Sequence, residues 1–174
     1  MTRSPTPDSG SDTTQRVRVA TGRDLQTLVR GNIALARETE GLRLDPGTVR
    51  AGVSAILDGR ASGRYYVLED RGSIVAQLLI TYEWSDWRDC PVWWIASVYV
   101  AQERRRQGLF AALYRAVRGF AHRDGAGGLR LYVERNNQAA MRVYEALGMN
   151  GEHYALYEEM FDTRGRVPGG LFDS

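Results

Sequence analysis

Residues 93–113 read WWIASVYVAQERRRQGLFAAL, and this stretch predicts a strand, a turn and a helix in succession. The apolar run from Val92 to Val100 is typical of a strand that is buried on both faces. After Gly108 the apolar residues recur three or four positions apart, so one face of a helix would be buried. The residues of this predicted face are Leu109, Ala112, Leu113, Ala116, Val117 and Phe120.

Three adjacent arginines, Arg104 to Arg106, lie in the predicted turn. The N-terminal end of a helix carries partial positive charge, so each arginine there costs about 0.3–1 kcal/mol. A bound anion would remove this conflict, because free backbone N–H groups and guanidinium groups both bind phosphate oxygens. Gly108 would allow the backbone to approach such an anion closely. Two interpretations stay open: a phosphate-binding turn, and a solvated basic turn above an ordinary crossover.

The composition of the 174 residues narrows the class of protein. A net charge of +2 does not indicate a nucleic-acid partner. The single Cys90 excludes an intramolecular disulfide and a cysteine-rich zinc site, and two histidines leave little scope for another metal site. No apolar stretch approaches the roughly 20 residues of a membrane span, and residues 1–14 contain no hydrophobic signal region. We therefore expect one soluble, cytoplasmic domain without a metal or a membrane partner.

The first half of the chain predicts two helices and a hairpin. Residues 1–14 are polar and are expected to be disordered. The elements expected after them are a strand over 15–20, a helix over 23–38, a helix from Asp45-Pro46 to Gly59, strands over 64–69 and 73–82, and a loop over 83–90. Asn32 lies on the apolar stripe of the first helix. We interpret it either as a polar residue at a helix boundary with a backbone partner, or as a ligand contact.

The second half predicts a strand over 129–134, a helix capped by Asn136 or Asn137, and a last strand over 152–161. The inner face of that helix consists of Ala140, Val143, Tyr144 and Leu147. A single domain would therefore span residues 15–162, followed by a flexible tail over 163–174. This order of elements predicts the α/β (α+β) class, with a single mixed sheet and helices on both of its faces.

Two motifs in these elements resemble the GNAT superfamily, the acyl-CoA-dependent N-acetyltransferases. SVYV at 97–100 followed by RRRQGL at 104–109 is similar to the family's (Q/R)xxGx(G/A) motif. Arg105 and Gly108 occupy its first two fixed positions, and Phe110 stands where the family has Gly or Ala. The segment from Asn137 to Tyr144 is similar to the family's NxxAxxxY helix. The resemblance covers roughly residues 16–161.

The resemblance implies a mostly antiparallel sheet with splayed central strands and acetyl-CoA as cosubstrate. Its pantetheine arm would lie between the strands that end near Val100 and Glu134. The backbone of Val98 and Val100 would hold this arm, and the N–H of Val98 would stabilise the oxyanion. Asn137 would contact it from the opposite wall. Backbone amides of the turn would hold the pyrophosphate; these belong to Arg105, Arg106, Gln107, Gly108, Leu109 and Phe110.

Transfer of an acyl group to an amine needs a neutral amine and a stabilised oxyanion, and the departing thiolate benefits from a proton. Tyr144 occupies the family's general-acid position; the alternative is a tyrosine on an inner helix face whose hydroxyl is satisfied by backbone. Glu83 is the carboxylate that we expect to act as base, directly or through a water. The competing carboxylates are Asp86, Asp89, Glu38 and Glu40.

The acceptor side is expected to attract a cationic amine. Two acidic loops and two tryptophans suit such a molecule by charge pairing and cation–π contact. The residues expected there are Asn32, Glu38, Glu40, Trp84 and Trp87. The tryptophans could equally form a dimer surface, so a homodimer stays open. Three functions are consistent with these patterns: acetylation of a small primary amine, which we favour, acetylation of a protein or aminoacyl-tRNA amine, and acyl-CoA binding without catalysis.

Overall fold

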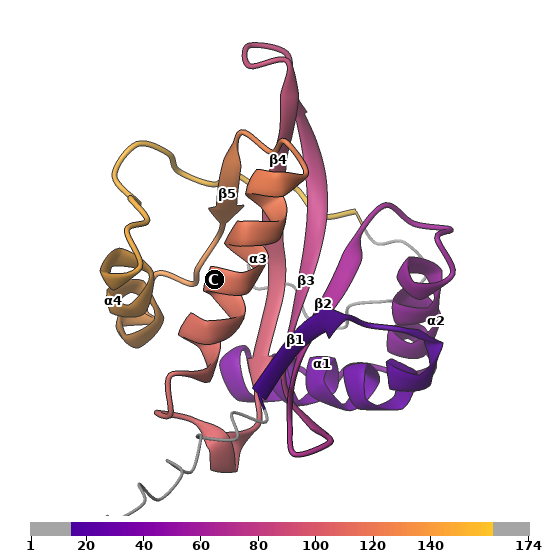
Figure 1. Cartoon of the computed structure of the whole chain (residues 1–174). Coiled ribbons are helices and arrows are strands. Elements are labelled where there is room, and N and C mark those ends of the chain that lie inside the picture. The colour runs from indigo at the N-terminus through magenta and orange to yellow at the C-terminus, as the bar shows by residue number, and fades with distance from the viewer. Residues whose placement is uncertain (1–14, 162–174) are drawn as a thin grey trace, which may run out of the picture.

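A computed structural model of the chain describes residues 15–161 and contains a five-stranded sheet of order β1–β2–β3–β4–β5 (Figure 1). Neighbours among the first four strands pair antiparallel, and β5 pairs parallel to β4. The strands are β1 (Gln15–Val19), β2 (Arg64–Asp70), β3 (Ser73–Ser85), β4 (Cys90–Val100) and β5 (Gly128–Leu131). The predicted mixed, mostly antiparallel sheet is confirmed. The expected tails, 1–14 and 163–174, and residue 162 of the expected domain lie outside the described residues.

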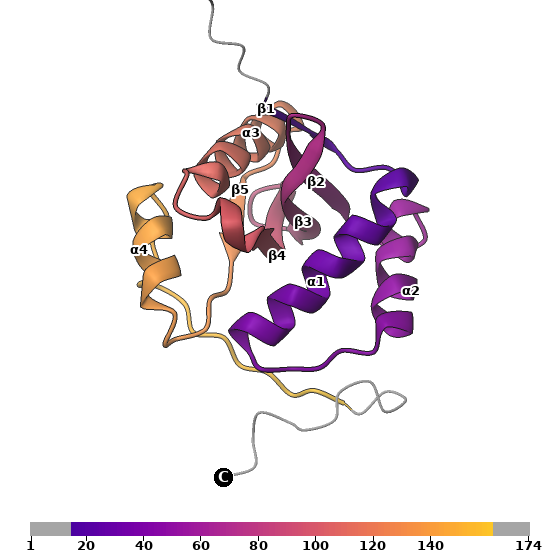
Figure 2. The ribbon, with the colours of Figure 1, turned by 90° about the horizontal axis from the view of Figure 1, so that it is seen from below.

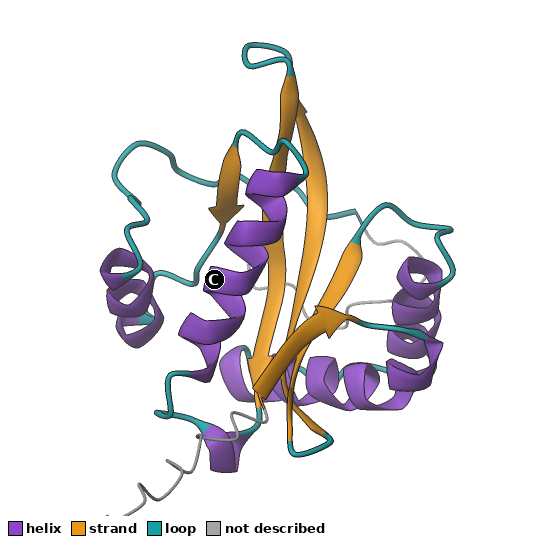
Figure 3. Ribbon diagram, viewed as in Figure 1, coloured by secondary structure: helices purple, strands orange, loops and turns teal. Residues whose placement is uncertain are grey.

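Helices cover both faces of the sheet, as predicted, with α1 and α2 on one side and α3 on the other (Figures 2 and 3). A fourth helix, α4, lies beside α3 at the margin of the sheet. The helical elements are η1 (Gly22–Asp24), α1 (Leu25–Thr39), α2 (Pro46–Leu57), η2 (Gln102–Arg104), α3 (Leu109–Arg123) and α4 (Gln138–Ala146). No helix within residues 15–161 has the length and apolar character needed to cross a membrane.

The two-residue period of β2 divides the core into two layers. Tyr65 and Val67 pack with residues of α1 and α2, whereas Tyr66 and Leu68 pack with residues of α3. All four side chains are buried. Because both faces of the central strands are covered, these strands are continuously apolar in sequence.

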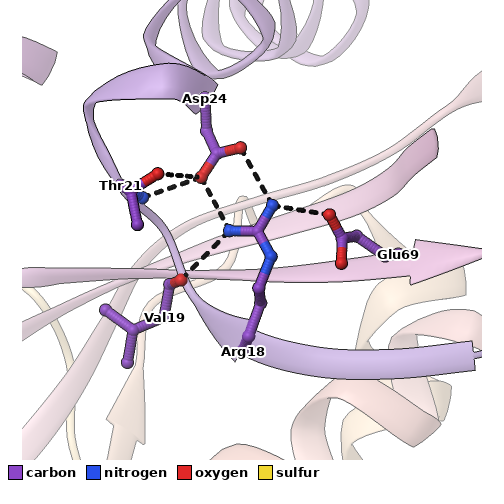
Figure 4. Close-up of polar contacts among 5 residues, drawn as sticks. All are labelled: Arg18, Val19, Thr21, Asp24 and Glu69. Atoms are coloured by element: carbon purple, nitrogen blue, oxygen red, sulfur yellow. Dashed lines mark hydrogen bonds and ion pairs between the residues drawn. The ribbon is translucent and has the colours of Figure 1, made fainter. Parts of the chain in front are cut away.

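An ion-pair cluster joins the start of α1 to the edge of the sheet (Figure 4). Arg18 of β1 donates two hydrogen bonds to Asp24, of 2.7 and 2.9 Å, and one of 2.6 Å to Glu69 of β2. The backbone N–H of Thr21 donates to the same Asp24 carboxylate at 2.7 Å. The hydrogen bonds from Arg18 lower the pKa of Asp24, so this carboxylate stays charged although it is buried.

A second polar cluster holds α1 against the sheet. Gln77 of β3 is buried and donates to the carbonyl of Leu28 at 3.1 Å and to Asn32 Oδ1 at 2.9 Å. Asn32 Nδ2 donates to the hydroxyl of Tyr65 at 2.9 Å. The interpretation of Asn32 as a helix-boundary residue with a backbone partner is therefore wrong. It lies inside α1, and its partners are side chains of the sheet.

The loop expected over 83–90 is shorter in the structure. The pairing of β3 with β4 continues through Glu83, Trp84 and Ser85, so only residues 86–89 connect the two strands. These strand ends extend beyond the core, and Trp84 is exposed there. Backbone hydrogen bonds between strands do not require buried side chains. The polar sequence therefore predicted a loop at positions where the strands are in fact paired.

Two other strand predictions are corrected. β5 ends at Leu131 instead of Glu134, because the ladder with β4 ends at the pair Ile95–Leu131. The strand expected over 152–161 is not formed, and that segment is exposed throughout. Apolar residues alone do not make a strand, since a strand needs a neighbour that supplies backbone partners. None of the described strands pairs with this segment.

Candidate active site

The central strands separate at a β-bulge in β4. On the β3 side, Leu79 pairs with Ser97 and Ile80 pairs with Ile95, so Ala96 is an extra residue in the ladder. On the β5 side, pairing stops at Ile95, and no described strand lies beside residues 96–100 there. Alternate backbone groups of β4 in this stretch therefore point away from β3 without a ladder partner. Bulges of this kind often lie next to active sites.

The turn after β4 leaves free backbone donors at the start of α3. Gly108 has φ of +73° and occupies the N-cap position, and no side chain caps the helix. The first helical bond from the cap runs from the N–H of Ala112 to the Gly108 carbonyl, at 3.0 Å. The preceding N–H groups, from Leu109 to Ala111, have no acceptor within the helix. Such a helix end suits an anion.

The three arginines of the turn differ in their contacts. Arg104 pairs with Asp70 and donates from Nε to Gln107 Oε1 at 3.1 Å. Arg105 pairs with Glu38. Arg106 has φ of +61° and is exposed, and it forms no ion pair within residues 15–161. Most of the positive charge that conflicted with the helix dipole is therefore balanced by carboxylates, and Arg106 is the arginine that remains available to an anion.

Arg105 also contacts the end of β4. Its Nε donates to the carbonyl of Val100 at 3.1 Å, and its guanidinium carbon lies 5.8 Å from the ring centre of Tyr99. Its charged group therefore joins the C-terminal ends of α1 and β4. The structure brings together two residues that the sequence had assigned to different ligands, since Glu38 was expected on the acceptor side and Arg105 on the cofactor side.

Asn137 is the N-cap of α4. It is one of the two residues predicted for that position. Its Oδ1 accepts a hydrogen bond of 3.1 Å from the N–H of Ala140. This bond uses the carbonyl oxygen of the side chain and leaves the amide nitrogen without a partner in the described chain. Asn137 thus fixes the start of α4 and keeps one donor.

Tyr144 lies on the side of α4 that faces α3. Its ring contacts the ring of Phe110 edge-on, with the centroids 5.6 Å apart and the planes at 73°. Burial raises the pKa of Tyr144 above its ordinary value of 10.0, so the phenol keeps its proton at neutral pH. Its hydroxyl forms no hydrogen bond with any residue in the described range. The backbone partner required by the alternative interpretation is therefore not seen.

A groove of about 440 Å³ separates α3 from α4. Small side chains line it together with Val143, Leu147 and two arginines, Arg115 of α3 and Arg142 of α4. The small residues are Ala111, Ala139 and Ala146. The two helices therefore lie apart along this stretch.

Glu83 is held by both neighbouring strands. Its Oε2 accepts a hydrogen bond of 2.6 Å from Trp94 Nε1 of β4, and its Oε1 accepts one of 2.6 Å from Arg130 Nη1 of β5. The guanidinium of Arg130 lies over the rings of Trp94 and Tyr154, 5.9 and 5.7 Å from their centres. Trp94 and Arg130 were not predicted as residues of the site. The alternation of β4 could have indicated Trp94, since Trp93 faces the opposite, buried layer.

The other expected acceptor residues are dispersed. Trp84 and Trp87 are 63% and 88% exposed at the tip of the β3–β4 hairpin. Trp84 pairs with Pro91, seven residues along β4 from Val98, which corresponds to roughly 23 Å. Glu40 follows α1, and its charge, with that of Glu158, adds to burial in raising the pKa of Tyr132. Glu40 therefore lies near Tyr132, the first residue after β5.

Asp86 and Asp89, the competing carboxylates, belong to the hairpin tip with Trp84 and Trp87. Asn32 uses both atoms of its amide within the cluster beneath α1. Within residues 15–161, no three side chains of His, Cys, Asp or Glu gather in a way that could hold a metal ion. The groups gathered around the end of β4 are thus backbone donors, Arg105 and Glu38, whereas Tyr144 lies on α4 against Phe110 of α3.

Comparison with known proteins gives the class to which this arrangement belongs. Residues 35–149 match the model of the acetyltransferase (GNAT) family. A solved structure described as a possible acetyltransferase from Clostridium difficile 630 is 39% identical to the chain, with a TM-score of 0.80. That match covers 86% of this chain and 99% of the other. No curated protein matches the sequence.

Two more distant structures share the fold. One is a ribosomal-protein-alanine N-acetyltransferase from Brucella melitensis biovar Abortus 2308, with 14% identity, a TM-score of 0.68, and coverage of 84% of this chain and 99% of the other. The second is an aminoglycoside acetyltransferase from an uncultured soil metagenomic sample. It has 16% identity, a TM-score of 0.69, and coverage of 87% and 99%. The fold and the matching family model define an acetyltransferase. The chain belongs to the GNAT acetyltransferase family.

Proposed function

We propose that this protein transfers the acetyl group of acetyl-CoA to the primary amine of a small molecule by direct attack of the amine. Three features of neighbouring elements support the proposal. These are the unpaired stretch of β4 after Ala96, the uncapped N-terminus of α3, and the free hydroxyl of Tyr144. Together they offer partners for an extended thioester arm, for phosphates and for a departing thiolate.

Each part of the cosubstrate would be held by a different element. Backbone N–H groups from Arg106 to Phe110, with Gly108 in the left-handed conformation, would bind the pyrophosphate, whereas the N–H of Arg105 already donates to the carbonyl of Gln102 at 3.4 Å. Backbone groups of Val98 and Val100 would hold the pantetheine arm along β4, and the amide of Asn137 would approach it from α4. Arg115 and Arg142 line the groove between α3 and α4.

The N–H of Val98 would stabilise the oxyanion that forms on the thioester carbonyl when the amine attacks. As the carbon–sulfur bond breaks, Tyr144 would donate its phenolic proton to the thiolate. A donor whose pKa is raised by burial is fully protonated at the start of each cycle. Glu83 would accept the proton of the amine through a water, since each of its oxygens accepts only one protein hydrogen bond and keeps a second lone pair.

The acceptor would be cationic before it reacts. Glu40 follows α1 and forms no ion pair within residues 15–161, so its negative charge attracts an ammonium group, whereas the charge of Glu83 is balanced by Arg130. We exclude Trp84 and Trp87 from this acceptor site because they are exposed at the hairpin tip, whereas the Glu83 carboxylate reaches along the sheet to Trp94 and Arg130.

The test is acetyl-CoA-dependent thiol release across a panel of small amines, for the wild type and for Tyr144→Phe. We expect saturating acetyl-CoA to raise the unfolding temperature of both proteins. We expect kcat of the variant to fall by about 10²-fold or more, the usual contribution of a general acid. Unchanged turnover in the variant would exclude Tyr144 as the acid. Thermal stabilisation without thiol release for any amine would contradict the assignment to small amines.

A further inference from the structure

Helix α4, which carries Tyr144, has weak attachment to the core. None of its nine residues is buried, whereas five residues of α3 are. The buried residues of α3 are Leu109, Leu113, Tyr114, Val117 and Ala121. Few contacts therefore fix the position of Tyr144: Leu147 and Met149 pack against the core beyond the end of α4, and the partly buried ring of Tyr144 contacts Phe110.

A groove lies between the two helices, which share little contact. Its lining includes three alanines, Ala111, Ala139 and Ala146, together with Val143 and Leu147. At the edge of this groove, Phe110 extends from the first turn of α3 to the ring of Tyr144. Its contact is edge-on, a geometry that aromatic rings favour beyond simple burial and that constrains their relative orientation.

Phe110 is itself anchored. Its ring also lies against Tyr114, with the centroids 6.1 Å apart, and Tyr114 is buried in the core beneath α3. Phe110 is also two residues after Gly108, so its backbone belongs to the anion-binding turn. One residue thus joins the turn, the buried side of α3 and the phenol of Tyr144.

We propose that Phe110 is the positioning residue for Tyr144, and that its ring sets where the phenol lies relative to the end of β4. This inference rests on the proposed function, in which Tyr144 is the general acid. It assigns a role to the one position of the turn motif that departs from the small residue of the family. The side chain of Phe110 acts on the position of the acid, while its backbone N–H is unchanged by substitution.

The inference is tested by a double-mutant cycle with Phe110→Ala, Tyr144→Phe and the combined variant, using acetyl-CoA-dependent thiol release. We expect Phe110→Ala to lower kcat about tenfold or more, since misplacement of a catalytic group by about 1 Å can cost up to about 10²-fold. We expect KM for acetyl-CoA to change less than about threefold. In the Tyr144→Phe background, Phe110→Ala should lower kcat no further, because the group that it positions is absent.

Two further variants separate positioning from folding. Phe110→Tyr keeps an aromatic ring at this position and should retain most of the wild-type kcat. Phe120→Leu removes a different ring of α3, one stacked on Tyr66 at 5.2 Å, and should leave kcat unchanged. Thermal unfolding of every variant reports whether the fold is intact.

Equal losses of kcat from Phe110→Ala in both backgrounds would overturn the inference and leave the proposed function standing, provided that Tyr144→Phe alone is impaired. A wild-type kcat for Phe110→Ala would overturn it as well. A wild-type kcat for Tyr144→Phe alone would instead remove the acid step of the proposed function, and the inference with it.

Discussion

The carboxylate of Glu38, at the end of α1, is ion-paired with the guanidinium of Arg105, in the turn between β4 and α3. This pair connects the helix on one face of the sheet with the turn that begins the helix on the other face. Arg105 also donates to the carbonyl of Val100, so its side chain holds the end of β4 at the same time. The contact joins the acceptor side and the acyl-CoA side of the proposed site.

Glu38→Gln should tighten acetyl-CoA binding. The pair is partly exposed, so its loss should change the free energy of unfolding by less than about 1 kcal/mol. The released charge of Arg105 would then attract the phosphates, and we expect Kd to fall about twofold to threefold at low salt. This gain in affinity should shrink as salt is added. Isothermal titration of both proteins with acetyl-CoA at two ionic strengths measures the difference in Kd. Asp58→Asn removes a similar exposed pair with Arg60 at the end of α2 and is the control. Weaker binding by Glu38→Gln would contradict this prediction.

Glu83→Gln should lower kcat about tenfold or more near neutral pH if the carboxylate accepts the proton of the amine. The deficit should narrow as the pH rises, because a growing fraction of the acceptor is already neutral in solution. A pH profile of thiol release for both proteins measures this. Asp86→Asn and Asp89→Asn, at the hairpin tip, serve as controls and should leave kcat unchanged. A loss of kcat that is constant across the pH range would exclude Glu83 as base.

Asp24→Asn should destabilise the protein at neutral pH by about 1–2 kcal/mol, through loss of its charged hydrogen bonds with Arg18. The folded pKa of Asp24 is lowered from 3.8, chiefly by Arg18. Its contribution is therefore complete above the unfolded value and disappears as the pH falls through the folded pKa. Urea unfolding at several pH values should show the two proteins converging below about pH 3.8. A difference that persists in acid would show that the charge is not responsible.

Gly31→Ala should destabilise the protein by about 1–3 kcal/mol, although alanine favours a helix. A Cβ at this position would lie 2.3 Å from Gln77 Oε1. The Gln77 amide cannot yield freely, because it is buried and bonded to Leu28 and Asn32. Gly52→Ala in α2 is the matched control, since nothing lies within 4 Å of its Cβ, and it should stabilise by about 0.5–1 kcal/mol. Denaturant unfolding measures both. Equal effects of the two substitutions would refute the clash.

Local patterns in the sequence were sufficient for most of the fold. Asp45 caps α2 through a 2.6 Å hydrogen bond from the N–H of Thr48, and Asn137 caps α4, as their residue types predicted. Of the face predicted for α3, Leu109, Leu113 and Val117 are buried and the other three residues are partly buried, but Tyr114 and Ala121 are buried as well and were not predicted. The predictions that were wrong concern elements whose extent depends on a neighbour. These were the ends of β3 and β5 and the absent strand over 152–161, because strand pairing is a property of two segments and not of one.

The sequence by itself determined the strand–turn–helix unit around Gly108 and the two motifs that carry the family, since the chemistry of each lies within a few consecutive residues. Only the tertiary structure decided the partners of the side chains in the site. Glu38 binds Arg105, Glu83 lies between Trp94 and Arg130, and Tyr144 contacts Phe110. These partners come from segments far apart in the chain, and a charge or a ring in a sequence does not specify which of many complementary groups it will meet. That choice is made by the packing of the layers and by the point at which β4 and β5 separate.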